Sequence, residues 1–174
     1  RKEGFDILFE ALSRVNKTRS TELYLYGPVH DNDRALLKKL SEINDLEGKV
    51  FFMGNIGTDQ LLTEFRKYHL LILPRPMSKQ SKYGFSTKLS EYLISGIPVL
   101  VTDVSDNSLY IKDSFNGYIV PPGSPEYLAT KILEIISTYK DKSREITRNA
   151  LETARREFDY HLYTQKFEKF FFGD

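Results

Sequence analysis

The hydrophobic positions alternate between helical and strand-like spacing along most of the chain. Apolar residues three and four apart predict amphipathic helices, and short apolar runs bounded by Gly or Pro predict buried strands. We therefore predict strands over 23–26, 50–53, 70–73, 99–102 and 117–120. We predict helices over 5–16, 31–43 and 59–68 (with Thr58 as the N-cap), a short helix near 87–95, a helix from 124 or 125 to about 139, and helix onward to 172 with a break near 158–159.

This order of elements predicts an α/β fold. Parallel strands need crossover connections, and helices of this length between strands supply them. We expect a Rossmann-like, doubly wound parallel sheet with helices on both faces, and 174 residues fit one compact domain. Ligands in such sheets bind at the carboxyl ends of the strands. The loops that matter are therefore 27–31, 54–58, 74–87 and 102–108.

Residues 83–101 are the most informative stretch. A polar loop runs into a short helix, which Gly96 and Pro98 end before another apolar strand. Backbone N–H groups at a helix start have no partner inside the helix and suit an anion, above all a phosphate. Glu91, just inside this helix, repels phosphate but accepts hydrogen bonds from hydroxyl groups such as those of a ribose. The combination predicts a nucleotide-sugar site.

The composition of the chain excludes several classes of binding site and partner. The net charge is +1, so no general basic field indicates a nucleic-acid partner. The chain has no cysteine, which excludes disulfides and thiolate metal sites. No apolar stretch reaches the roughly 20 residues of a membrane span. The Asp31-Asn32-Asp33 run imitates a metal-binding Asp-x-Asp motif, but its place at a helix start favours a capping role.

Several segments in order resemble the C-terminal half of a retaining glycosyltransferase of the GT-B architecture, the glycosyltransferases group 1 family. The resemblance covers nearly the whole chain. The segments that carry it are Lys2-Glu3-Gly4-Phe5-Asp6, Leu25-Tyr26-Gly27-Pro28, Lys49 to Gly54, Leu71 to Pro74, Gly84 to Glu91 with Gly96-Ile97-Pro98-Val99, and Asn116 to Val120.

The resemblance assigns roles position by position. Glu91 matches the glutamate that contacts the donor ribose, whereas Tyr83 stands where the family has a second glutamate near the reaction centre. Lys2, after a one-residue shift, matches a basic residue that clamps the diphosphate. In the donor loop, Gly84, Phe85 and Ser86 match residues that approach the donor sugar. Thr87 and Lys88 match residues whose backbone amides face the diphosphate. The pocket for the base is expected near Gly54, Asn55 and Ile56. Tyr83 and Lys88 are the candidate catalytic residues.

The implied activity is transfer of a sugar from a UDP- or GDP-linked donor, with retention, to a glycan or lipid-linked acceptor in polysaccharide synthesis. No cofactor and no metal are implied. The acceptor side, the family's first strand and a matching Arg would belong to a preceding part, so we expect a fragment that is inactive alone. The implied location is cytoplasmic, at the inner face of a membrane if the full protein associates with one peripherally.

Other interpretations stay open at this point. The chain can be a non-catalytic domain of the same fold that serves for docking, which Tyr83 in place of Glu favours and Glu91 disfavours. It can also be an epimerase or phosphorylase on the same architecture. Glu91 and Lys88 can be solvated helix residues, and Tyr83 can simply pack against Phe85. The aromatic residues after 157 can pack on the domain or face a partner domain.

Overall fold

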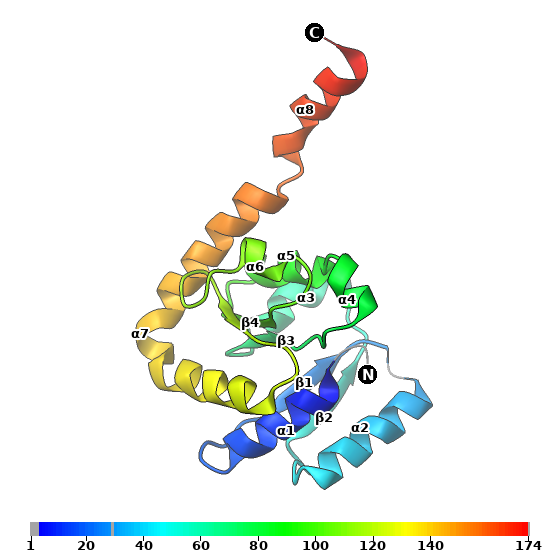
Figure 1. The fold of residues 1–174 in the computed structure, drawn as a ribbon, viewed down its shortest axis with the longest axis vertical. Coiled ribbons are helices and arrows are strands. Elements are labelled where there is room, and N and C mark those ends of the chain that lie inside the picture. The colour runs from blue at the N-terminus through cyan, green and yellow to red at the C-terminus, as the bar shows by residue number, and fades with distance from the viewer. Residues whose placement is uncertain (1–3, 29, 174) are drawn as a thin grey trace.

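The computed structural model describes residues 4–28 and 30–173, apart from the side chains at 31, 32, 80, 165 and 166. Figure 1 shows an α/β body from which the C-terminal helix projects. The strands are β1 (Leu23–Tyr26), β2 (Val50–Gly54), β3 (Leu71–Leu73), β4 (Val99–Thr102) and β5 (Tyr118–Val120). The helices are α1 (Phe5–Asn16), α2 (Asp31–Ile43), α3 (Thr58–Phe65), α4 (Lys79–Tyr83), α5 (Thr87–Ile94), α6 (Asn107–Tyr110), α7 (Pro125–Phe158) and α8 (His161–Phe172).

All strand pairs in the described part of the chain are parallel, as the alternation of helix and strand predicts. β1 pairs with β2, with a register shift between Leu25 and Tyr26, and β4 lies between β3 and β5. The strands therefore form two sheets, of two and three strands, rather than one. Helices lie on both faces, which confirms the α/β class with parallel strands (Figure 1).

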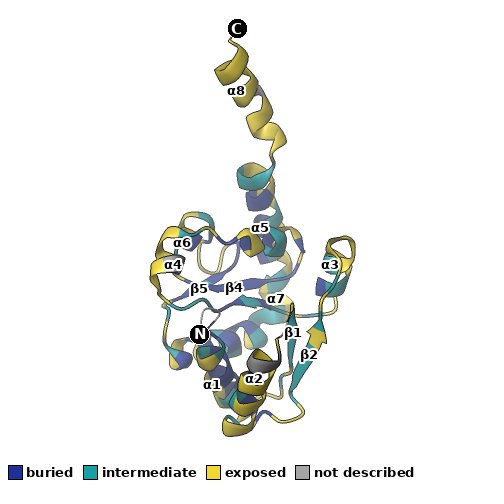
Figure 2. Cartoon of the chain, turned by 90° about the vertical axis from the view of Figure 1, so that its right-hand side faces the viewer, coloured by how far each residue is buried: buried dark blue, intermediate teal, exposed yellow. Residues whose placement is uncertain are grey.

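One hydrophobic core joins the two sheets. The buried face of α1, with Phe9 and Val15 fully covered, packs together with Leu100 of β4 and with α7. Partly buried leucines of β1 pack against this same core, as does Ile72 of β3. All four residues of β4 are buried, which explains why its apolar run has no polar alternation (Figure 2). The two sheets thus form one layer above a shared core.

Several boundaries differ from the sequence prediction. Thr58 is the first residue of α3 and Gly57 its N-cap, so the predicted cap is wrong by one residue, and α3 ends at Phe65. His30, not the Asp31-Asn32-Asp33 run, is the N-cap of α2. Two short helices, α4 and α6, lie in segments that we predicted as loops. The helix predicted to end near Tyr139 continues without interruption to Phe158, and the predicted break follows there.

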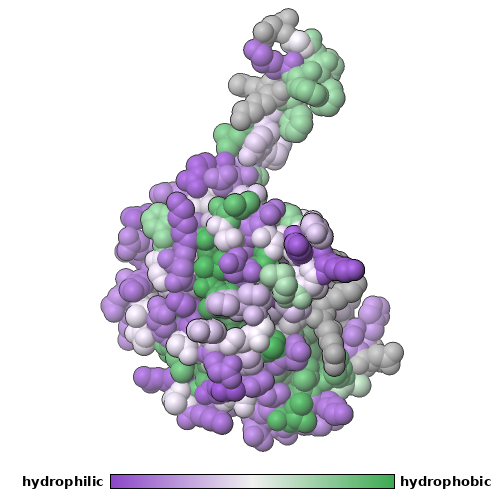
Figure 3. Space-filling model, viewed as in Figure 1, coloured by the Kyte–Doolittle hydropathy of each residue, from purple (hydrophilic) through white to green (hydrophobic). Residues whose placement is uncertain are grey.

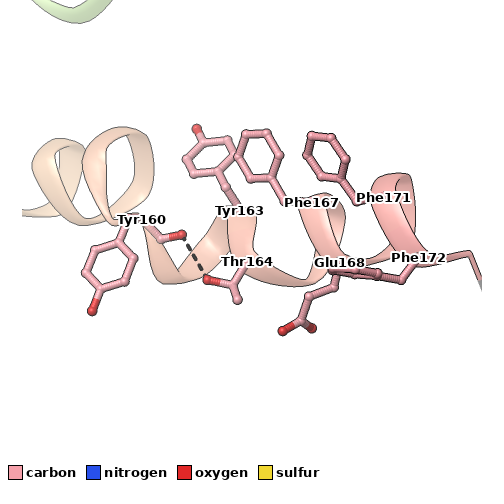
Figure 4. Close-up of a pocket in the computed structure, with 7 residues that line it drawn as sticks. All are labelled: Tyr160, Tyr163, Thr164, Phe167, Glu168, Phe171 and Phe172. Atoms are coloured by element: carbon pink, nitrogen blue, oxygen red, sulfur yellow. Dashed lines mark hydrogen bonds between the residues drawn. The ribbon is translucent and has the colours of Figure 1, made fainter.

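Helix α8 projects away from the body (Figures 1 and 2). Phe170 is 80% exposed and Phe172 86% exposed, so the aromatic residues of α8 do not pack on the domain, whereas Phe158 at the end of α7 does. Figure 3 shows hydrophobic side chains gathered on α8, above a mostly polar body. The rings of Tyr163, Phe167 and Phe171 line up on one side of the helix (Figure 4). A row of exposed rings is typical of an interaction surface.

A buried amide holds the loop before β5. Asn116, 3% exposed, donates from Nδ2 to the carbonyl of Tyr110 and to Oγ1 of Thr153, each at 2.8 Å, and its Oδ1 accepts the N–H of Lys112 at 2.8 Å. The side chain therefore joins α6, the loop and α7. Because a buried polar group is costly without its partner, this network stabilises the observed conformation of the loop.

We expect Asn116→Ala to lower the free energy of unfolding by about 2–4 kcal/mol, because it leaves a buried carbonyl, hydroxyl and N–H without their partner. Denaturant unfolding measures the loss. Asn55→Ala, at an exposed loop position, is the matched control and should change the stability by less than about 0.5 kcal/mol. Equal stability of the two variants would contradict the role of the network.

Candidate functional site

The carboxyl ends of the parallel strands carry the candidate site. Gly27 follows β1, Gly54 ends β2, Pro74 follows β3 and Asp103 follows β4. The N–H of Gly27 donates to the carbonyl of Gly54 at 2.9 Å, so the first two of these loops leave the sheet together. This edge is where ligands of open α/β sheets bind.

Helix α5 begins at this edge. Ser86 is its N-cap and is 7% exposed, and its side chain makes no capping hydrogen bond. The carbonyl of Ser86 accepts the N–H of Leu89 at 2.9 Å. The amides of Thr87 and Lys88 lie in the first turn, where N–H groups point out along the helix axis. The start of α5 therefore presents donors and the positive end of the helix dipole to the loops around it.

Glu91 lies on the same face of α5 as this first turn. It comes four residues after Thr87 and three after Lys88, a spacing that places side chains one above the other on a helix. The opposite face is anchored, because Leu89 and Leu93 are fully buried in the core. Glu91 itself is half-buried, neither turned into the core nor fully in water. A carboxylate thus stands one turn past the outward-facing amides.

The loop before α5 is tied to the rest of the sheet. The hydroxyl of Ser105, in the loop after β4, donates to the carbonyl of Gly84. Ser105 has φ of 56°, an uncommon backbone conformation for a residue other than glycine. Thr102, at the end of β4, donates from Oγ1 to the carbonyl of Arg75 at 2.6 Å. Two hydroxyls near the end of one strand thus fix both loops that flank α4.

An aromatic triad supports Phe85. Its ring centroid lies 5.7 Å from that of Tyr110 and 5.7 Å from that of Phe158, and the latter two rings are 4.9 Å apart. The triad links the donor loop predicted from the sequence to α6 and to the last residue of α7. The ring of Tyr83 is not part of this triad, which does not favour the alternative that Tyr83 simply packs against Phe85. Tyr83 is 81% exposed, and the ammonium of Lys82 lies 5.4 Å from its ring centre.

We expect Phe158→Ala to lower the free energy of unfolding by about 1–3 kcal/mol, because it removes two aromatic pairs that are each worth about 0.5–1.5 kcal/mol. Denaturant unfolding measures the change. Phe115→Ala removes a ring that is 53% exposed and should change the stability by less than about 0.5 kcal/mol. If the two variants are equally stable, Phe158 does not hold the triad together.

The remaining predicted site residues lie around the same edge. Gly54 has φ of 77° and lets the chain turn sharply as it leaves β2, while Asn55 is exposed and Ile56 half-buried. Lys2 lies outside the described residues. Gly4, two residues later, is buried as the N-cap of α1, and a Cβ on it would lie 1.8 Å from the carbonyl oxygen of Pro74. The start of α1 therefore sits directly against the loop after β3.

Sequence reasoning missed the residues that hold this site in shape. Ser105, Tyr110 and Phe158 come from segments far apart along the chain, and no local pattern connects them. It also missed a cluster near the end of β1, where the hydroxyl of Tyr26 donates to Glu64 at 2.6 Å and contacts the hydroxyl of Tyr68. Burial and these hydrogen bonds raise the pKa of Tyr26 far above its usual value, so its phenol stays a donor.

No helix among residues 4–28 and 30–173 has the length and apolar character to cross a membrane. The same residues hold no group of three or more His, Cys, Asp or Glu side chains arranged to bind a metal ion.

The chain belongs to the family described as Glycosyl transferases group 1, whose family model matches residues 1–153. It is 28% identical over 134 residues to the poly(ribitol-phosphate) alpha-N-acetylglucosaminyltransferase of Staphylococcus aureus, covering 76% of this chain and 25% of that protein. It is 23% identical over 138 residues to an uncharacterized glycosyltransferase of Methanocaldococcus jannaschii, covering 79% of this chain and 34% of that one. The chain thus spans about a quarter to a third of these relatives.

Solved structures show the same fold. A glycosyltransferase from Rickettsia africae matches with a TM-score of 0.85 and 23% identity over 98% of this chain and 44% of its own. HepE of Anabaena in complex with UDP matches with a TM-score of 0.82 and 21% identity over 97% of this chain and 45% of its own. The C-terminal domain of LpcC from Francisella tularensis matches with a TM-score of 0.75 and 21% identity over 91% of this chain and 80% of its own. The fold is that of GT-B glycosyltransferases.

Proposed function

We propose that this chain is the donor-binding, C-terminal domain of a glycosyltransferase, and that it holds a nucleoside diphosphate sugar at the start of α5. The observation that carries the proposal is the arrangement of that helix: amides of Thr87 and Lys88 in its first turn, with the half-buried carboxylate of Glu91 one turn further on the same face. The amides bind the diphosphate, and the carboxylate accepts hydrogen bonds from the ribose hydroxyls.

The helix start favours bond cleavage as well as binding. As the bond from the sugar to the diphosphate breaks, its electron pair stays on the phosphate oxygen, where negative charge grows. Amides and a helix dipole that already point there stabilise this charge more in the transition state than in the ground state. Lys88 adds a positive charge on the same turn, and Lys2 is proposed to reach the diphosphate from the segment before α1. We propose that this stabilisation needs no metal ion in this protein.

The sugar side of the site is proposed to lie along Gly84, Phe85 and Ser86. Their loop is held by Ser105 and by the aromatic triad, so its backbone approaches a ligand in one conformation. Tyr83, largely in solvent, is proposed to act at the reaction centre only when acceptor and donor are both bound. The base is proposed to bind between Gly54, Asn55 and Ile56, beside the carboxyl ends of β1 and β2.

UDP is the proposed nucleotide, because HepE of Anabaena, which shares this fold, has been solved with UDP and with UDP-glucose. GDP is the alternative. The acceptor is proposed to be a glycan or a lipid-linked sugar that another domain binds, with retention of configuration as in the family that the sequence resembles. The exposed aromatic face of α8 is the proposed contact with that domain. The relatives are about three to four times longer than the segment that this chain matches, which leaves room for a domain that binds the acceptor.

Calorimetric titration of the full-length protein with UDP, GDP and CDP tests the proposal. We expect one diphosphate to bind with a one-to-one stoichiometry and the others at least about 10-fold more weakly, because the base pocket adds contacts that the shared diphosphate and ribose do not. The corresponding nucleoside monophosphate should bind more weakly than the diphosphate. A protein that binds none of the three would be a docking module, which overturns the proposed function.

A further inference from the structure

The segment from Phe65 to Ser90 carries positive charge only. It contains no Asp or Glu, although the chain as a whole has 24 of them against 25 Lys and Arg. Its part after β3 holds Arg75, Lys79 and Lys82, in the loop and in helix α4 that lead directly to the start of α5. None of these three cations forms an ion pair with another residue that the structure describes. The approach to the candidate site therefore presents positive charges that no described carboxylate pairs with.

Helix α4 has one outward face. Lys79, Lys82 and Tyr83 are all exposed, and they lie three and four residues apart, a spacing that puts side chains next to one another on a helix. Ser81 lies on the opposite side of the helix and is 2% exposed. The ammonium of Lys82 lies beside the ring of Tyr83. The outward face of α4 thus combines two cations with an open aromatic ring.

Hydrogen bonds hold this face in a fixed position relative to the candidate site. The hydroxyl of Ser81, on the buried side of α4, donates to the carbonyl of Pro76 at 2.7 Å and also completes a capping box. Two hydroxyls at the end of β4 hold the loops on either side of α4. α4 ends at Tyr83, and only Gly84 and Phe85 separate it from the N-cap of α5. A substrate that reaches a sugar held along this loop therefore lies against α4.

We propose that the outward face of α4 binds the reactive end of the acceptor, and that this acceptor is an anionic glycan. The inference rests on the proposed function, because it needs a donor sugar held along residues 84–86. The ring of Tyr83 offers an apolar surface to one face of a sugar. The ammonium groups of Lys79 and Lys82 attract a phosphate or carboxylate that this sugar carries. The face is about one helical turn long, roughly 5.4 Å, which fits one sugar unit rather than a membrane surface.

Surface plasmon resonance on immobilised dextrans tests this inference. The full-length protein, saturated with the nucleoside diphosphate that it binds, is passed over neutral, phosphorylated and carboxymethylated dextran. At about 0.1 M salt we expect at least one anionic dextran to bind about 10-fold more tightly than neutral dextran, and the tighter of the two identifies the anion. Equal affinity for all three overturns the inference. Equal affinity for phosphatidylglycerol vesicles, which carry charge but no sugar, assigns the face to a membrane and also overturns it.

Two double variants with the same change in net charge locate the site. Lys79→Gln/Lys82→Gln should bind the preferred anionic dextran about 10-fold more weakly than the wild type, because it removes both ammonium groups. Lys39→Gln/Lys142→Gln removes two charges from exposed positions on α2 and α7 and should bind as the wild type does. If the two double variants bind this dextran alike, the anion lies elsewhere and the inference is wrong.

Titration with the nucleoside diphosphate separates this inference from the proposed function. Both double variants should bind the nucleotide as the wild type does, because none of the four lysines belongs to the proposed donor site. A wild type that binds the nucleotide but no anionic dextran contradicts the acceptor inference alone. A wild type that binds no nucleoside diphosphate contradicts the proposed function, and this inference with it.

Discussion

Replacing Glu91 by Gln is expected to lower the affinity of the full-length protein for UDP by about 10- to 100-fold. A hydrogen bond to a charged group contributes about 1.5–3 kcal/mol, and the amide that replaces the carboxylate keeps the shape but loses the charge. The side chain is half-buried on the face of α5 that carries Thr87 and Lys88, so the change is local. Isothermal titration with UDP measures the affinity, and the unfolding midpoint should stay within experimental error.

Glu47→Gln is the matched control. It makes the same chemical change at an exposed position in the turn that leads into β2, at the amino edge of the sheet. We expect its affinity for UDP to equal that of the wild type. If Glu91→Gln binds UDP as tightly as Glu47→Gln does, Glu91 is a solvated helix residue and does not contact the ribose.

Replacing Gly4 by Ala is expected to have the largest effect on stability, more than about 4 kcal/mol, at the high end for a single substitution. Its φ of 68° already disfavours a side chain, and the new Cβ would lie 1.8 Å from the carbonyl oxygen of Pro74. A backbone atom cannot rotate away as the tip of a side chain can. The start of α1 or the loop after β3 must therefore move, and both border the candidate site.

Gly48→Ala separates the cost of the left-handed backbone conformation from the cost of the clash with Pro74. Gly48 has nearly the same backbone conformation, with φ of 72°, but a Cβ there meets no atom within 4 Å. We expect a loss of about 1–2 kcal/mol, the cost of the left-handed conformation alone. Denaturant unfolding of both variants measures the difference. Equal losses would show that the start of α1 does not press against Pro74 in solution.

The elements that the sequence predicted well are those with strong local patterns. The bounds of α1 and α2 agree because apolar residues recur at helical spacing, and β1 and β4 agree because Gly or Pro flanks an apolar run. α4 was missed because Lys79–Tyr83 contains no apolar periodicity, and its capping box uses Ser81 where a Glu or Gln is usual. Helix was predicted on both sides of Tyr139, but as two helices rather than the single α7, because the residues that follow Tyr139 are mostly charged.

Residues of the candidate site also fall into two groups, those that a local sequence pattern predicts and those that depend on the tertiary fold. The start of α5 and the place of Glu91 follow from a local pattern, and the structure puts both at the carboxyl edge of the sheet. The support of Phe85 by Phe158 depends on the path of α7 across the domain, which no local pattern encodes. The division of the strands into two sheets was equally beyond prediction from sequence, because it depends on which strand edges meet in the fold rather than on the pattern of any one strand.

The most direct test is a crystal structure of the full-length protein with UDP, or with GDP if titration selects it. We predict that the diphosphate oxygens accept hydrogen bonds from the amides of Thr87 and Lys88, and that a ribose hydroxyl donates to Glu91 within about 3 Å. Nucleotide bound elsewhere, or bound with Glu91 facing solvent and the first turn of α5 in contact only with protein, would contradict the account.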